Sequence, residues 1–132
     1  MVCNHKRMID LQTERRLEYF FSLLGSHVTH ITPQMELVDH PFRLHLEARD
    51  DYLIIALTLQ IPNNQRNSAL MSLLTQYIPE RVEGIPIRSF LTSSELVASC
   101  CISQDSAPQT WLALYHTLKT MLWQAQLTHA PT

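Results

Sequence analysis

Apolar and polar residues recur along the chain with periods that predict eight secondary-structure elements. Residues 8 to about 25 are predicted to form a helix, because their apolar side chains fall on one face at i, i+3, i+4 and i+7: Leu17, Phe20, Phe21 and Leu24. Gly25 is well placed to end this helix. A polar linker follows and is closed by Pro33.

Three strands are predicted next, over residues 34–39, 42–48 and 52–61, from alternating or continuous apolar residues. The connector Arg49-Asp50-Asp51 is too short for a helical crossover, so the last two strands should form an antiparallel hairpin. In the third strand one face is apolar throughout. The other face carries Ile54 and Ala56 before it becomes polar.

A second helix is predicted over residues 64–78, ending before Pro79. Met71 lies on a flank of its apolar stripe, which is formed by Leu70, Leu73, Leu74, Tyr77 and Ile78. Two more strands are predicted over residues 85–91 and 96–103.

The last predicted helix runs to about Leu127. Ser106 and Gln109 have the spacing of a capping box, and Pro108 suits a first helical turn. One wide apolar face marks this helix: Trp111, Leu114, Tyr115, Leu118, Met121, Leu122 and Ala125.

The predicted order is therefore α-β-β-β-α-β-β-α, in which antiparallel strands cluster between helices. This order indicates an α+β fold with a twisted antiparallel sheet packed against helices. At 132 residues the chain is long enough for one domain with its own core. We expect a single domain over 1–132, with an ordered core at about 8–128 and loose termini.

Charge and cysteine content exclude several classes of protein. The net charge is -2, and the basic residues are scattered among acidic ones, so there is no nucleic-acid footprint. The three cysteines form no disulfide framework, which favours a reducing cytoplasm. We find no signal peptide and no apolar run long enough to cross a membrane, so no membrane insertion is expected.

Candidate chemistry is sparse, and we expect neither a cofactor nor a metal. Two glycines are too few for a phosphate-binding loop, and the seven histidines lack the paired spacing of a zinc site. The one catalytic constellation to weigh is Cys100 or Cys101 as a nucleophile with His116 as its base. A strand cysteine that packs in the core is the simpler interpretation, so we predict no enzyme.

The chain has more apolar faces than one small domain is expected to cover. All three helices carry wide stripes, the third strand is apolar on both faces, and residues 85–91 add further apolar side chains. Uncovered apolar patches usually mark interfaces, and a two-fold homodimer explains them economically. A monomer that buries all of these residues stays open as an alternative.

From about residue 8 to 128 the chain resembles the class I type III secretion chaperones of Gram-negative bacteria. An amphipathic helix, "RRLEYFFSLLG", is followed by the hairpin "FRLHLEARDDYLIIALTLQI", the helix "SALMSLLTQYI", two strands and the closing helix "TWLALYHTLKTMLW". The resemblance implies a cytoplasmic homodimer. It would bind the N-terminal region of secreted effectors in an extended form and pass it to the export apparatus and its ATPase. A small thiol-dependent enzyme and a generic dimeric adaptor or regulatory protein are the alternatives.

The resemblance also implies which positions meet the partners. In this family the effector grooves are built from the first helix and the sheet. The matching positions are the exposed members of this set: Leu17, Phe20, Leu24, Met35, Leu37, Phe42, Leu44, Ile54 and Ala56. The second helix and the following strand usually meet across the dimer, which points to Leu70, Leu74, Ile85, Ile87 and Phe90.

Overall fold

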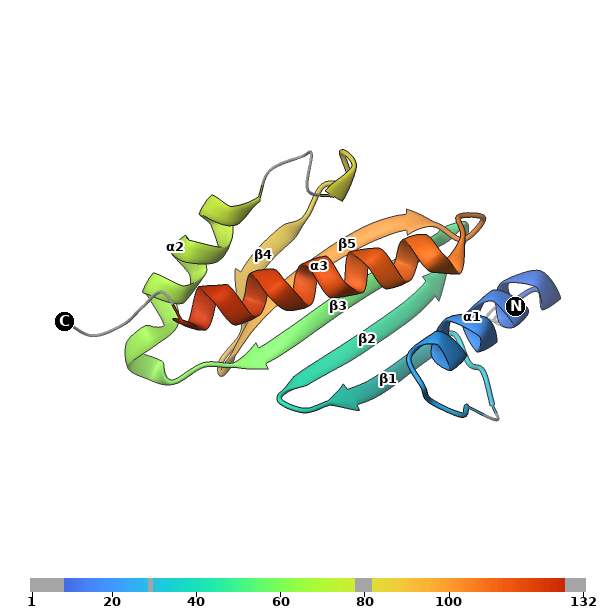
Figure 1. Cartoon of the computed structure of the whole chain (residues 1–132), viewed down its shortest axis with the longest axis horizontal. Helices are drawn as coiled ribbons and strands as arrows, with labels where there is room; N and C mark the ends of the chain where they lie inside the picture. Colours follow the sequence, from blue (N-terminus) through green and yellow to red (C-terminus); the bar gives the residue numbers. More distant parts are fainter. Residues whose placement is uncertain (1–8, 29, 78–81, 128–132) are drawn as a thin grey trace, which may run out of the picture.

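The computed structural model describes residues 9–28, 30–77 and 82–127, which form a five-stranded antiparallel sheet with three α-helices on one of its faces (Figure 1). The strands are β1 (Gln34–Asp39), β2 (Phe42–Arg49), β3 (Tyr52–Gln60), β4 (Arg88–Leu91) and β5 (Glu95–Ser103), in the spatial order β1-β2-β3-β5-β4. The helices are α1 (Leu11–Leu23), α2 (Arg66–Gln76, preceded by a short 3₁₀ turn at Asn63–Gln65) and α3 (Pro108–Leu127). The predicted α+β class and order of elements are confirmed.

Helix α1 begins and ends where its capping residues lie. The Asp10 side chain accepts a hydrogen bond from the Thr13 N–H at 2.7 Å, which is an N-cap contact. At the other end Gly25 adopts φ = 78°, and the Ser26 N–H donates to the Phe21 carbonyl at 2.9 Å. This is a Schellman motif, so Gly25 ends the helix as predicted.

Strands β2 and β3 form the predicted antiparallel hairpin, with Arg49 opposite Tyr52 and a two-residue turn between them. Asp50 lies in the left-handed region at φ = 53°, which aspartate tolerates better than most residues. The β1–β2 turn contains a cis peptide bond between His40 and Pro41.

The core lies between the sheet and the helices. Helix α3 crosses the middle of the sheet (Figure 1), and all seven residues of its predicted apolar face are buried. Opposite them, Leu53, Ile55, Leu57 and Leu59 of β3 are at most 3% exposed. Phe20 of α1 joins this core through an edge-to-face contact with Trp111, their ring centroids 5.8 Å apart. None of the described helices covers the opposite face of the sheet.

Two predictions about local structure were wrong. Strand β4 begins at Arg88 rather than at residue 85, since Pro86 cannot donate a ladder hydrogen bond. The capping box at the start of α3 does not form. The Ser106 hydroxyl instead accepts a hydrogen bond from the Trp111 indole N–H at 2.7 Å, and the Gln109 amide lies 3.5 Å from the Tyr19 hydroxyl.

Helix α2 also differs in part from its prediction. Ala69 and Leu73 are its buried residues, whereas Leu74 is 48% exposed and Met71 is 60% exposed. The predicted end of this helix at residue 78 lies outside the described residues. Helix α2 packs on α3 and β4 at the margin of the sheet, so only a narrow line of its surface is covered.

Candidate partner-binding surfaces

Strand β1 forms one edge of the sheet and pairs with β2 alone. The Ala48 N–H donates to the Pro33 carbonyl at 2.8 Å, so Pro33 and Ala48 are a hydrogen-bonded pair. In an antiparallel ladder such pairs recur at every second residue, which makes Met35, Leu37 and Asp39 the residues of β1 that bond to β2. The backbone N–H and C=O groups of Gln34, Glu36 and Val38 therefore point away from β2. Among the described residues, one side chain forms a hydrogen bond with these outward backbone groups: the Thr32 hydroxyl donates to the Gln34 carbonyl at 2.6 Å.

Beside this edge lies a row of half-buried apolar side chains. Met35 and Leu37 of β1 face the helices, and Leu24 follows the end of α1. All three pack against the core and stay partly accessible, as expected for the exposed members of the predicted effector-binding set. Val28 and Ile31 of the α1–β1 linker extend the row. The sequence analysis missed them because a polar linker shows no periodicity.

Four members of the predicted effector-binding set are core residues. Leu17, Phe20 and Leu44 are at most 1% exposed, and Phe42 is 5% exposed. Leu17 and Phe20 lie on the buried face of α1, and Phe42 and Leu44 lie on the helix side of β2. None of the four is available to an extended partner, so the exposed members of the predicted set do not include them.

Ile54 and Ala56 lie on the open face of the sheet, opposite to Met35 and Leu37. They are half-buried between polar neighbours on the adjoining strands, because Ile54 pairs with Glu47 and Ala56 with His45. The predicted set therefore divides between two faces of the sheet and does not form a single groove. A role for either face in binding stays a prediction.

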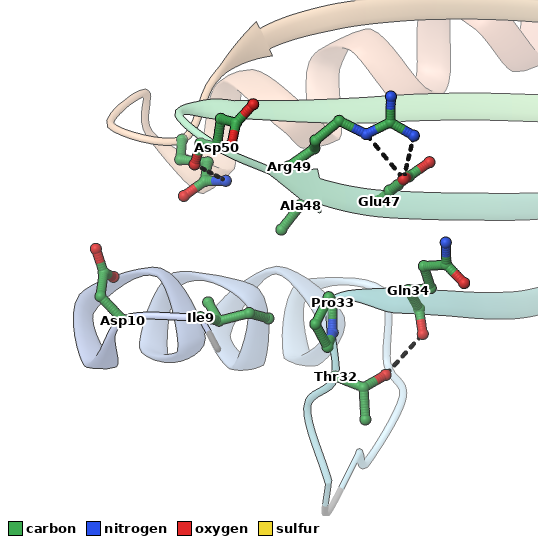
Figure 2. A pocket seen from close by; sticks show the side chains of 10 residues that line it. Ile9, Asp10, Thr32, Pro33, Gln34, Glu47, Ala48, Arg49 and Asp50 are labelled. Carbon is green, nitrogen blue, oxygen red and sulfur yellow. Dashed lines mark hydrogen bonds and ion pairs between the residues drawn. The ribbon is translucent and has the colours of Figure 1, made fainter. Parts of the chain in front are cut away.

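A cavity of about 1020 Å³ lies where the start of β1, the end of β2 and the start of α1 meet (Figure 2). Its apolar lining comes from Ile9, Pro33 and Ala48. The Arg49 guanidinium at its rim donates two hydrogen bonds to Glu47, at 2.7 and 3.1 Å, which raises the Arg49 pKa above its ordinary value. The cavity is contiguous with the outer edge of β1 through Gln34.

Gln104 connects the elements around this cavity. Its side-chain amide donates to the carbonyls of Asp50 and Tyr52 at 3.0 and 2.7 Å, which holds the β2–β3 turn. Its carboxamide oxygen accepts from the Thr13 hydroxyl at 3.2 Å, and its backbone carbonyl accepts from Arg16 at 3.2 Å. A single glutamine in a loop gives no sequence signal for this role.

At the other end of β1 the Asp39 carboxylate is held by two side chains of α3. The Tyr115 hydroxyl and the Lys119 ammonium group both donate to it, the latter at 2.7 Å. These two hydrogen bonds lower the Asp39 pKa below its usual value, and the bond from Lys119 has the larger effect. The Tyr115 pKa is raised by burial and by the same hydrogen bond.

The predicted dimer residues gather on the side of the molecule formed by α2, β4 and the segment that precedes β4. Leu74 is 48% exposed and Phe90 is 42% exposed, while Leu70, Ile85 and Ile87 are half-buried against the core. Met71, at 60% exposed, adds to this surface. Strand β4 pairs with β5 alone, so its outer edge is a second open edge of the sheet.

The candidate thiol site does not assemble. Cys100 is 3% exposed in the core, where burial raises the pKa of its thiol to about 12. Cys101, the next residue of β5, is exposed on the open face, whereas His116 lies on α3, which covers the other face. A thiol with so high a pKa is a poor nucleophile.

Neither a metal site nor a membrane-spanning helix is present in the part of the chain that the structure describes. Its histidine, cysteine and carboxylate side chains form no group of three or more that could hold a metal ion. Its helices are too short or too polar to cross a bilayer.

Comparisons with solved structures show the fold. A chain of the Yersinia pestis type III secretion chaperone SycH in complex with a stable fragment of YscM2 matches with a TM-score of 0.59 at 18% identity, over 89% of this chain and 99% of that one. A chain of the HopA1–SchA chaperone–effector complex matches with a TM-score of 0.62 at 16% identity, over 90% and 98%. YbjN of E. coli, described as a candidate transcription regulator, matches with a TM-score of 0.54 at 10% identity, over 91% and 90%.

Family membership comes from the sequence itself. No curated protein matches the chain at a significant level. The SsaM family model, however, matches residues 10–125, which is most of the chain. The chain therefore belongs to the SsaM family, a family of type III secretion chaperones, and it has the fold of the class I effector chaperones.

Proposed function

We propose that the protein is a homodimeric chaperone of the bacterial cytoplasm that binds the N-terminal chaperone-binding segment of type III secreted effectors. The dimer would keep this segment extended and competent for secretion until the export apparatus and its ATPase receive it. It would do so by binding alone, without catalysis. The observation that carries the proposal is the open outer edge of β1, with Met35 and Leu37 half-exposed beside it.

An extended segment would bind this edge as a sixth strand. Its backbone would pair with the outward N–H and C=O groups of Glu36 and Val38, which supplies affinity without regard to sequence. Alternate side chains of the segment would lie on the helix side next to Met35 and Leu37. Because those two positions are apolar, the site favours apolar residues at every second position of the segment.

The surface formed by α2 and β4 supports the homodimer. It combines exposed apolar side chains, such as Leu74 and Phe90, with an open strand edge. A contiguous apolar surface of this kind is costly to leave in water, and two-fold association buries it twice. This surface lies at the opposite margin of the sheet from β1, so dimerisation would leave both β1 edges free.

The test compares two substitutions of the same residue. Glu36→Pro removes an N–H that the chain itself does not use, and Glu36→Ala removes the same side chain while keeping that N–H. The probes are N-terminal fragments of each protein that the source bacterium secretes through its type III apparatus. We expect at least one fragment to bind the wild-type protein and the Ala variant, and to bind the Pro variant at least about tenfold more weakly.

Thermal unfolding of both variants provides the control for stability, since a Pro variant that unfolds at a lower temperature would confound the comparison. Equal binding by two folded variants would contradict strand addition at β1. Failure of every fragment to bind the wild-type protein would contradict the chaperone proposal. It would favour the alternative of a generic adaptor or regulatory protein; YbjN, which is described as a candidate transcription regulator, has the same fold.

A further inference from the structure

The indole of Trp123 is an exposed aromatic side chain next to the end of β1. It is 43% exposed, and its ring packs on Phe42 with the centroids 6.1 Å apart. Phe42 is the register partner of Asp39, the last residue of β1. The other tryptophan of the chain, Trp111, is fully buried in the core.

The Phe42 ring on which Trp123 packs has contacts of its own. Lys119, one helical turn earlier on α3, lies over the rings of Phe42 and Tyr115, with Nζ 5.6 and 5.4 Å from their centroids. The same ammonium group is bound to Asp39. The charges of Asp39 and Lys119 are therefore paired with each other, and Trp123 adds an exposed aromatic ring beside them.

This aromatic surface continues the half-exposed row beside β1. Met35, Leu37 and Asp39 follow one another on the helix side of the strand. Because Tyr115 and Lys119 bind the Asp39 carboxylate, it presents no free charge to an apolar neighbour. An extended segment that leaves the open edge at Asp39 thus meets the exposed ring of Trp123, which packs on Phe42.

We propose that Trp123 is a specificity-determining anchor for the bound segment. It would receive one large apolar or aromatic side chain of that segment where the segment passes the C-terminal end of β1. The inference rests on the proposed function and adds to it a preference at one position, since strand pairing alone does not select side chains. A partly exposed tryptophan that packs on a second ring has the properties of an interface hot spot.

The chain offers an optical test of this contact because it holds two tryptophans, one buried and one exposed. Acrylamide should quench the Trp123 emission of the free protein, and a bound fragment should protect it and shift it to shorter wavelength. In the Trp123→Phe variant the remaining indole is Trp111, so the quenchable fraction should be absent both with and without the fragment. The probes are the N-terminal secreted fragments described above.

Affinity provides the second readout. Trp123→Ala should weaken binding of the fragment at least about tenfold, and Trp123→Phe, which keeps an aromatic ring on Phe42, should recover most of the loss. Tyr52→Ala is the matched control, because Tyr52 is 54% exposed on the opposite face of the sheet. It should leave the affinity unchanged.

Each outcome decides between the two proposals. A fragment that binds wild-type and Trp123→Ala proteins equally, with the indole still quenchable, overturns the anchor and leaves the chaperone proposal intact. Loss of binding in the folded Tyr52→Ala variant to the same extent would also overturn the anchor, because the effect would not be local to Trp123. If no fragment binds the wild-type protein, both proposals fail.

Discussion

The hydrogen bond between Tyr115 and Asp39 fastens the β1–β2 hairpin to α3, and its removal has a calculable cost. Tyr115 is 2% exposed, so Asp39→Ala leaves a buried hydroxyl without its acceptor, which costs about 1–3 kcal/mol. The lost ion pair with Lys119 adds less than about 1 kcal/mol, because about a third of each side chain or more is exposed to solvent. We expect Asp39→Ala to lower the free energy of unfolding by about 2–3 kcal/mol.

A double-mutant cycle isolates this hydrogen bond. Tyr115→Phe removes the donor and leaves the carboxylate with Lys119, at a cost of about 1–1.5 kcal/mol. The double variant has no buried hydroxyl that could lose its acceptor. Its cost in unfolding free energy should therefore be about 1 kcal/mol smaller than the sum of the costs of the two single variants. In urea denaturation at pH 7, Asp39→Ala should lower the midpoint by roughly 1 M. Additivity of the two single costs to within about 0.5 kcal/mol would refute the reasoning.

The same carboxylate gives a pH dependence with a definite sign. The folded-state pKa of Asp39 is lowered, so its contribution is fully present above the unfolded pKa of about 4 and is lost as pH falls through the folded value. The cost of Asp39→Ala should therefore shrink in acid. Glu36→Ala is the control, because the Glu36–Arg43 pair is exposed and should cost less than about 1 kcal/mol at any pH. An equal cost of Asp39→Ala at neutral pH and well below pH 4 would contradict this linkage.

Three further predictions follow from burial and contacts. Iodoacetamide should label Cys101 in the native protein and label Cys100 only after unfolding, as followed by mass spectrometry; equal native rates would contradict the assigned burial. Leu74→Asp should reduce the mass in light scattering from twice 15.3 kDa to 15.3 kDa, whereas Val38→Asp, at 63% exposed on β1, should not. Gln104→Ala should lower the urea midpoint by an amount equivalent to about 2 kcal/mol; a loss below about 0.5 kcal/mol would show that its contacts are replaced by water.

The helices show which part of the fold the sequence predicts. The stripe of α3 was predicted residue by residue, since a helix across the middle of a sheet buries its whole apolar face. For α2 the predicted buried face was only partly right. This helix lies at the margin of the sheet and buries only Ala69 and Leu73. Periodicity identifies an apolar face, but only tertiary packing decides how much of it is covered.

The candidate site shows the same limit. Alternation correctly assigned Ile54 and Ala56 to the face opposite Leu53 and Ile55. It gave no means of knowing that α3 would cover Phe42 and leave Leu37 half-exposed, although both residues lie on the helix side. That difference depends on where the helices lie above the sheet, which is a non-local property.

A proline lies shortly before each of the two edge strands. Pro33 accepts a hydrogen bond from Ala48 but has no N–H to return, so β1 begins only after it, at Gln34. Continuing the β4–β5 register two residues back from the Arg88–Ser99 pair places Pro86 opposite Cys101, and β4 begins only after it. Both edge strands are therefore short. A short edge presents a few outward backbone groups, which suffice for one specific segment while limiting pairing between like chains. A short edge of this kind is what the proposed binding of one extended segment at β1 requires.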